Sequence, residues 1–110
     1  MSDRSSELLI EDILGSALKI QRYVSGIDFE GFAADEKTAD AVVRNFEIIG
    51  EAANRLPKEF KARYQEVDWE RIRGFRNRIV HDYFGIDYSI VWNIVQNFLP
   101  ELIQELSKIN

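Results

Sequence analysis

The sequence predicts an all-α protein, a bundle of three or four main helices with short helices between them. Apolar residues recur at steps of three and four residues along most of the chain, which is the period of an amphipathic helix. Only two prolines and six glycines interrupt the 110 residues. This length is typical of one domain, so residues 1–110 are expected to form a single domain.

The first half of the chain predicts two long helices joined by a short turn. The first spans about residues 5–24, can be capped by Ser5 or Ser6, and ends at Ser25-Gly26. Its apolar stripe consists of Leu9, Ile10, Ile13, Leu14, Ala17, Ile20 and Val24. Asp28 can cap a turn that carries Phe29 and Phe32. The second helix spans about residues 36–56 after Asp35, with the stripe Ala39, Val42, Val43, Phe46, Ile49, Ala53 and Leu56.

The second half predicts a short helix and two further main helices. Pro57 fits the first position of a short helix that runs through Tyr64. Asp68 can cap a third helix over about residues 69–82, before the breaker Gly85. Asp87 can cap a last long helix, which Pro100 should kink because proline lacks a backbone donor and crowds a carbonyl. The apolar sides of these helices are Ile72, Phe75, Ile79 and Val80, then Val91, Trp92, Val95, Phe98, Leu99, Leu102, Ile103 and Leu106.

Five aromatic side chains lie on these apolar stripes and are expected in the core. They are Phe46, Trp69, Phe75, Trp92 and Phe98. A ligand-binding aromatic cage is the less favoured interpretation of the same pattern.

Composition excludes several classes of protein. Fourteen basic and nineteen acidic residues give a net charge of −5, so any contact with nucleic acid must be local. The chain has no cysteine, which excludes disulfides, thiolate metal sites and a cysteine nucleophile. No segment approaches the ~20 apolar residues of a membrane span. Glu7, Glu11 and Asp12 interrupt the N-terminal apolar stretch, so we expect no signal peptide, no membrane contact and a cytoplasmic location.

The segment between Glu70 and Asp82 is a local concentration of positive charge. It holds the arginine cluster, Arg71, Arg73, Arg76 and Arg78, and no acidic residue. Arginine suits phosphate because its planar guanidinium stays charged and donates two hydrogen bonds. His81, the only histidine, follows directly, and a group that titrates near neutrality beside phosphate-binding groups suits acid–base cleavage of a phosphodiester. A solvated arginine face with a structural histidine is the alternative interpretation.

Helix geometry limits how these residues can cooperate. Asn77 and His81 are four residues apart, so their side chains are neighbours on a helix, and Arg78 precedes His81 by three. Arg76 lies about 140° around an ideal helix from His81, so one straight helix does not bring the two together. Either the helix loosens before Gly85 or a second subunit completes the site.

Other patterns are weaker. A polar stripe on the second long helix is expected to be an ion-paired exposed or interfacial face; it consists of Asp40, Arg44, Glu47, Glu51 and Asn54. Its glutamates lack the Glu-x-x-His pairs of a two-metal bundle, so we expect no metal and no cofactor. No phosphate-binding loop, dinucleotide glycine pattern or Gly-x-Ser-x-Gly is present, so the chain is not expected to be a nucleotidyltransferase itself.

The segment Arg76 to Tyr83, RNRIVHDY, resembles the signature of HEPN-domain ribonucleases, in which an arginine and a polar residue precede a histidine. The tyrosine two residues after the histidine resembles the HepT toxin branch of that superfamily. The similarity extends to KTADAVVRNFEIIGEAANRL (37–56), VDWERIRGFRNRIVHDYFGID (67–87) and VWNIVQNFLPEL (91–102), and so covers nearly the whole chain in order.

This resemblance implies an up-and-down helical bundle that forms a homodimer or a higher even oligomer, with one site composed from two protomers. It implies metal-independent cleavage of RNA, with Arg76 and His81 as catalytic residues. Asn77 would orient His81, and Arg78 would support phosphate binding. Tyr83 matches the tyrosine that a minimal nucleotidyltransferase antitoxin, MntA, modifies with AMP in this family.

Two specific functions therefore remain open at the level of the sequence, beside a helical dimer of unrelated use. The first is a toxin of a type VII toxin–antitoxin system, an endoribonuclease that its nucleotidyltransferase partner neutralises. The second is a non-catalytic scaffold that binds this partner together with nucleotides or RNA. The presence of Arg76, Asn77, His81 and Tyr83 together favours the enzyme, because a scaffold does not need all four.

Overall fold

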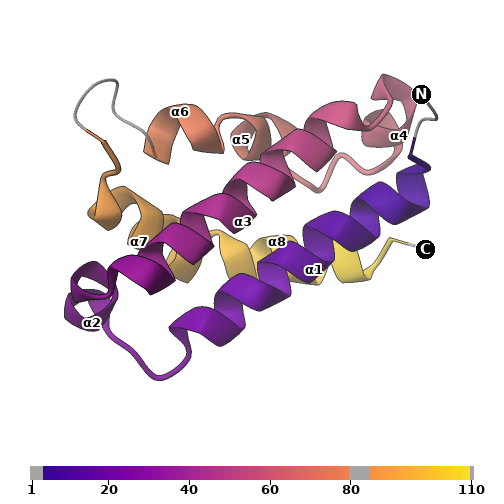
Figure 1. Ribbon diagram of the computed structural model, residues 1–110. Helices are drawn as coiled ribbons and strands as arrows, with labels where there is room; N and C mark the ends of the chain where they lie inside the picture. Colours follow the sequence, from indigo (N-terminus) through magenta and orange to yellow (C-terminus); the bar gives the residue numbers. More distant parts are fainter. Residues whose placement is uncertain (1–3, 80–84, 110) are drawn as a thin grey trace.

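A pair of long antiparallel helices, α1 (Ser6–Val24) and α3 (Glu36–Arg55), forms the centre of the molecule (Figure 1). The computed structural model describes residues 4–79 and 85–109, without the side chain of Arg76. The other helices in this part of the chain are α2 (Phe29–Ala34), α4 (Lys58–Arg63), α5 (Trp69–Arg73), α6 (Phe75–Ile79), α7 (Tyr88–Asn97) and α8 (Leu99–Ser107). α3 packs against α1 on one side and against α5 and α6 on the other. The predicted all-α bundle is confirmed.

Most of the predicted helix starts are confirmed. The side chains of Ser5, Asp28, Asp35, Asp68 and Asp87 each accept a backbone N–H from the first turn of the following helix. Such bonds satisfy donors that have no partner within the helix, which fixes where each helix begins. For α1 the cap is Ser5, which accepts from the N–H of Leu8 at 3.2 Å.

The prediction for Pro57 is wrong by one position. Pro57 is the N-cap of α4, with extended backbone angles of φ −63° and ψ 151°, and the helix begins at Lys58. The fixed φ of proline is compatible with both positions, so the sequence pattern does not distinguish them.

Two helices that the sequence predicts as continuous are divided. The third main helix is split at Gly74 into α5 and α6, and the last is split at Phe98 into α7 and α8. Pro100 lies in the first turn of α8 instead of kinking a single helix. The break precedes the proline because its missing N–H is harmless only in a first turn, where helical donors have no acceptor.

The buried residues form one contiguous core that joins all the predicted apolar stripes. Phe32, Phe46 and Phe75 are its largest fully buried side chains. The core prediction is confirmed for Phe46, Phe75 and Phe98, whereas Trp69 and Trp92 are only partly buried. Trp69 remains near the surface because its indole N–H donates to the carbonyl of Tyr64 at 3.0 Å.

Across the two described ranges, we find no helix with both the length and the apolar character that crossing a bilayer requires.

Candidate functional site

Phe75 anchors the helix that carries the start of the predicted motif. Its ring is fully buried and makes edge-to-face contacts with Phe46 at 5.1 Å and with Phe98 at 5.3 Å between ring centroids. These two partners belong to α3 and to the junction of α7 and α8. Contacts of this kind on both sides fix the position and rotation of α6, and hence of the residues that follow Phe75.

The structure describes only part of the predicted catalytic set. Asn77 and Arg78 are exposed on α6 and make no hydrogen bond or ion pair through their side chains within the described residues. The side chain of Arg76, and residues His81 and Tyr83 as a whole, lie outside the described residues. The roles of all five therefore stay predictions.

The chain is tied together on both sides of the segment that contains His81 and Tyr83. The backbone N–H of Asp87 donates to the carbonyl of Ile79 at 3.0 Å, which joins the end of α6 to the start of α7. Gly85 has φ +84°, a left-handed conformation that glycine adopts without strain, so the predicted chain break is confirmed. Asp87 also accepts from the N–H and hydroxyl of Ser89, at 3.0 and 2.6 Å.

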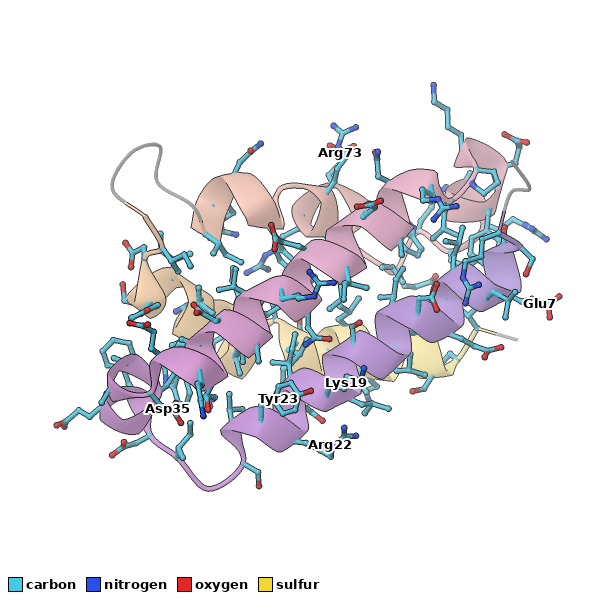
Figure 2. The ribbon with its side chains drawn as sticks, in the orientation of Figure 1. Glu7, Lys19, Arg22, Tyr23, Asp35 and Arg73 are labelled. Carbon is cyan, nitrogen blue, oxygen red and sulfur yellow. The ribbon has the colours of Figure 1, made fainter. Side chains whose placement is uncertain are left out.

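Arg71 and Arg73, the first two members of the arginine cluster, lie in different environments. Arg73 points away from the protein at α5, as Figure 2 shows, and pairs at 3.1 Å with the neighbouring exposed Glu70. Arg71 instead lies over the ring of Phe98, with its guanidinium carbon 4.4 Å from the ring centroid. The Nε of Arg71 is buried and has no hydrogen-bond partner among the described residues. Arg71 thus packs on the core, and it differs in this from Arg73 of the same cluster.

The polar stripe of α3 is exposed, as predicted. Glu47, Glu51 and Asn54 line a surface groove of about 450 Å³ that Arg73 of α5 borders. The stripe was also expected to be ion-paired. Within the described part of the chain, however, Arg44, Glu47 and Glu51 form no ion pair. Unpaired charges on one helix leave this face available to groups from outside the chain.

A second surface feature was not recognised from the sequence. A hollow of about 710 Å³, which we call the basic hollow, lies between α4 and α5. Its lining consists of Lys58, Lys61, Ala62, Gln65, Glu66, Val67, Asp68, Trp69, Glu70 and Arg73. The charge distribution offered a signal. Eight of the fourteen basic residues but only four of the nineteen acidic ones lie between positions 55 and 79, so this stretch carries +4 and the remainder −9.

No group of three or more acidic or histidine side chains suited to a metal ion occurs within residues 4–79 and 85–109.

Comparison with known proteins places the chain in a family. Residues 13–109 match the family described as "Ribonuclease HepT-like". The chain is 40% identical to "Putative RNase TTE0752" of Caldanaerobacter subterraneus subsp. tengcongensis, over 91% of this chain and 89% of that protein. It is 37% identical to "Putative RNase MJ0127" of Methanocaldococcus jannaschii, over 99% and 90% of the two chains. It is 36% identical to "Probable ribonuclease HepT" of Thermococcus cleftensis, over 96% of each chain. No solved structure gives a significant match. A match over nearly the whole chain means that this protein belongs to the HepT-like ribonuclease family.

Proposed function

We propose that this protein is a metal-independent endoribonuclease and the toxin of a toxin–antitoxin pair. One observation carries the proposal: Arg76, Asn77, His81 and Tyr83 stand at motif spacing within the range that matches the ribonuclease family. The exposure of Asn77 and Arg78 on α6 is consistent with it, since both can reach a substrate from solvent.

The proposed reaction uses the ribose 2′-hydroxyl as the nucleophile. His81 accepts the proton of this hydroxyl as its oxygen attacks the neighbouring phosphorus. The bond from phosphorus to the 5′-oxygen breaks, and the leaving oxygen takes a proton from the second His81 of the dimer or from water. The products are a 2′,3′-cyclic phosphate and a 5′-hydroxyl. Arg76 binds the phosphate and stabilises the negative charge that develops on it.

The proposed site is composed from two protomers. Arg76 and His81 do not share one face of an ideal helix, and an isologous two-fold contact supplies each residue twice around one cleft. Phe75 supports this arrangement, because a rigidly anchored α6 presents the same surface in every copy.

The proposed control is the transfer of AMP to Tyr83 by a partner nucleotidyltransferase. The phenol oxygen forms a bond to the α-phosphorus of ATP and pyrophosphate leaves. The added phosphate carries a negative charge that arginines nearby in the sequence can hold, which occupies the place of an RNA phosphate. Incubation with partner, ATP and magnesium should add mass in units of AMP to Tyr83 and abolish cleavage. Tyr83→Phe should show neither change, whereas Tyr23→Phe, at an exposed tyrosine of α1, should behave as wild type.

The decisive test is cleavage of RNA by purified protein in excess chelator. We expect cleavage to persist and to yield cyclic phosphate ends. His81→Ala should lower the rate about a hundred- to ten-thousandfold while the helical circular dichroism is retained, because no other histidine can carry the proton. Equal cleavage by wild type and His81→Ala would contradict the proposal and favour the non-catalytic scaffold.

A further inference from the structure

We propose that the basic hollow between α4 and α5 binds the backbone of single-stranded RNA beyond the cleaved bond, with Trp69 stacking on one base. This inference rests on the proposed ribonuclease function, and it adds a substrate-binding surface outside the motif.

Two of the three cations of the basic hollow have no ion-pair partner within the described residues, and the third forms only an exposed ion pair. Lys58 and Lys61 are three residues apart on α4, so they share one face of the helix, and neither has an ion-pair partner within the described residues. Arg73 enters from α5 and pairs with Glu70 while both side chains are exposed, at 59% and 82%. Exposed ion pairs contribute little, so a phosphate can replace Glu70 at Arg73 at small cost.

The carboxylates of the hollow are mostly engaged. Asp68 accepts the backbone N–H of Arg71 at 3.1 Å and thereby caps α5. Glu70 pairs with Arg73. Glu66 also lines the hollow and forms no ion pair within the described residues. The lining holds three cations and three carboxylates, a formal charge of zero. Outside the cap of α5 and the Arg73–Glu70 pair, Lys58 and Lys61 remain against Glu66, so the unpaired groups carry a charge of +1.

Trp69 gives the hollow a second property that RNA requires. Its indole N–H is held by the carbonyl of Tyr64, so the ring keeps one orientation, and the ring is partly exposed where it lines the hollow. A fixed aromatic ring beside lysine and arginine is the usual means of binding single-stranded nucleic acid without sequence preference.

The hollow adjoins the helix that precedes the predicted motif. Arg73 borders both the hollow and the groove on α3, and α6 follows α5 directly after Gly74. On the α3 side the groove carries Glu47 and Glu51 beside Arg55. The inferred path of a strand from α6 runs along α5 toward α4, where two lysines have no ion-pair partner within the described residues.

The test measures binding of single-stranded RNA carrying 2′-O-methyl groups, which cannot be cleaved through the 2′-oxygen. The variant Lys58→Gln, Lys61→Gln, Arg73→Gln should bind a strand of about 12 nucleotides ten- to a hundredfold more weakly at 0.1 M salt. The slope of log K for binding against log salt concentration should fall in magnitude by about 2, because each lost phosphate contact contributes about 0.7. Binding of a strand of about 4 nucleotides should change little, since so short a strand does not span both sites.

The matched control is Lys19→Gln, Arg22→Gln, Lys37→Gln, which removes the same charge from exposed positions elsewhere. Figure 2 shows Lys19 and Arg22 on α1, on the other side of the molecule from Arg73. This control should keep wild-type affinity and slope. A Trp92→Phe protein, in which Trp69 is the remaining tryptophan, should lose fluorescence when the long strand binds.

The outcomes separate this inference from the proposed function. If the wild type cleaves RNA and both triple variants bind RNA with wild-type affinity, the proposed role of the hollow is wrong and the proposed ribonuclease function stands. If the wild type does not cleave RNA but the Lys58, Lys61 and Arg73 variant binds it more weakly, the proposed ribonuclease activity is wrong and the proposed binding surface stands. If both triple variants lose the same affinity for RNA, the effect comes from the overall charge of the protein, and the hollow is not a binding site.

Discussion

Arg71 and Arg73 are two residues apart in the sequence and lie in different environments. Arg71 covers the ring of Phe98 and buries its Nε, whereas Arg73 is exposed beside Glu70. The aliphatic part of an arginine can contribute as much through packing as its charge does through pairing. The two residues therefore allow stability and RNA binding to be separated.

Arg71→Ala should lower the free energy of unfolding by about 1 to 2 kcal/mol, because Phe98 loses its cover and a cation–π contact. Its affinity for RNA should stay within about twofold of wild type. Arg73→Ala should do the reverse, leaving stability within about 0.5 kcal/mol and weakening RNA binding. Urea unfolding and anisotropy titration measure the two quantities. Loss of RNA binding in Arg71→Ala with unchanged stability would restore Arg71 to the phosphate-binding set.

Asp35 couples the start of α3 to pH. Its side chain accepts from the hydroxyl and the N–H of Thr38, at 2.7 and 3.2 Å, and these bonds hold the pKa of Asp35 below 3.8. A folded pKa below the unfolded value stabilises the protein above pH 3.8, and this contribution is lost as the pH falls through the folded value.

Asp35→Ala should therefore unfold at a lower temperature than wild type near neutral pH. The difference in unfolding temperature between the two proteins should stay constant down to about pH 5. It should narrow below pH 3.8, because Asp35 of the wild type becomes protonated there. Asp40→Ala, at an exposed carboxylate within α3 that caps no helix, serves as the control. A gap that does not depend on pH would show that the charge of Asp35 is irrelevant to the cap.

Among the helices, Pro100 determines where α8 begins after the end of α7. The N–H of Phe98 still donates to the carbonyl of Ile94, and that of Leu102 donates to the carbonyl of Phe98, both at 3.0 Å. Hydrogen bonding thus continues on both sides of the break, and the proline occupies a first turn that suits its fixed φ.

Pro100→Ala should for this reason lower the free energy of unfolding by about 0.4 to 1 kcal/mol, chiefly by giving the unfolded chain more freedom. Gln104→Ala, at an exposed position further along α8, should change it by less than about 0.5 kcal/mol. Urea denaturation of the three proteins compares these effects. A gain in stability for Pro100→Ala would mean that the proline strains a helix that is otherwise continuous.

Apolar period and capping residues predict most of the elements. The stripes of α1 and α3 are buried almost throughout, and Asp28, Asp35, Asp68 and Asp87 cap the helices expected of them. The breaks at Gly74 and Phe98 do not follow from period, because the apolar positions on both sides keep the helical spacing. At Gly74 the two short helices α5 and α6 each pack against α3, whereas the break at Phe98 follows from Pro100.

The candidate site was less accessible to sequence reasoning. Spacing places Asn77 and Arg78 on one short helix, but it cannot tell that Arg71 turns inward while Arg73 turns outward. Lys58 and Lys61 belong to α4 whereas Trp69 belongs to α5, so no single helical motif unites the three. Their proximity is a property of the tertiary fold, and only the excess of basic residues between positions 55 and 79 hints at it.

At the scale of the whole molecule, the proposed composite site requires an assembly. We expect light scattering to give about twice the mass of the 12.8 kDa chain, or a higher even multiple, at micromolar concentration. Mixing inactive His81→Ala with inactive Arg76→Ala should restore part of the cleavage, because the shared cleft of the mixed dimer then holds one Arg76 and one His81. A monomer that retains cleavage would contradict the composite site.

The antiparallel pair of α1 and α3 has a consequence for how the chain reaches its native state. Only the short α2 separates the two helices, so their contacts join residues close in sequence and form rapidly on folding. We expect truncations inside this pair, such as Ile13→Ala or Ile49→Ala, to slow refolding, and truncations on α4 to hasten unfolding instead. The folding nucleus would then be separate from the edge that we propose binds RNA. That edge could exchange its lysines and arginines during evolution, and so acquire new targets, without delaying the assembly of the bundle.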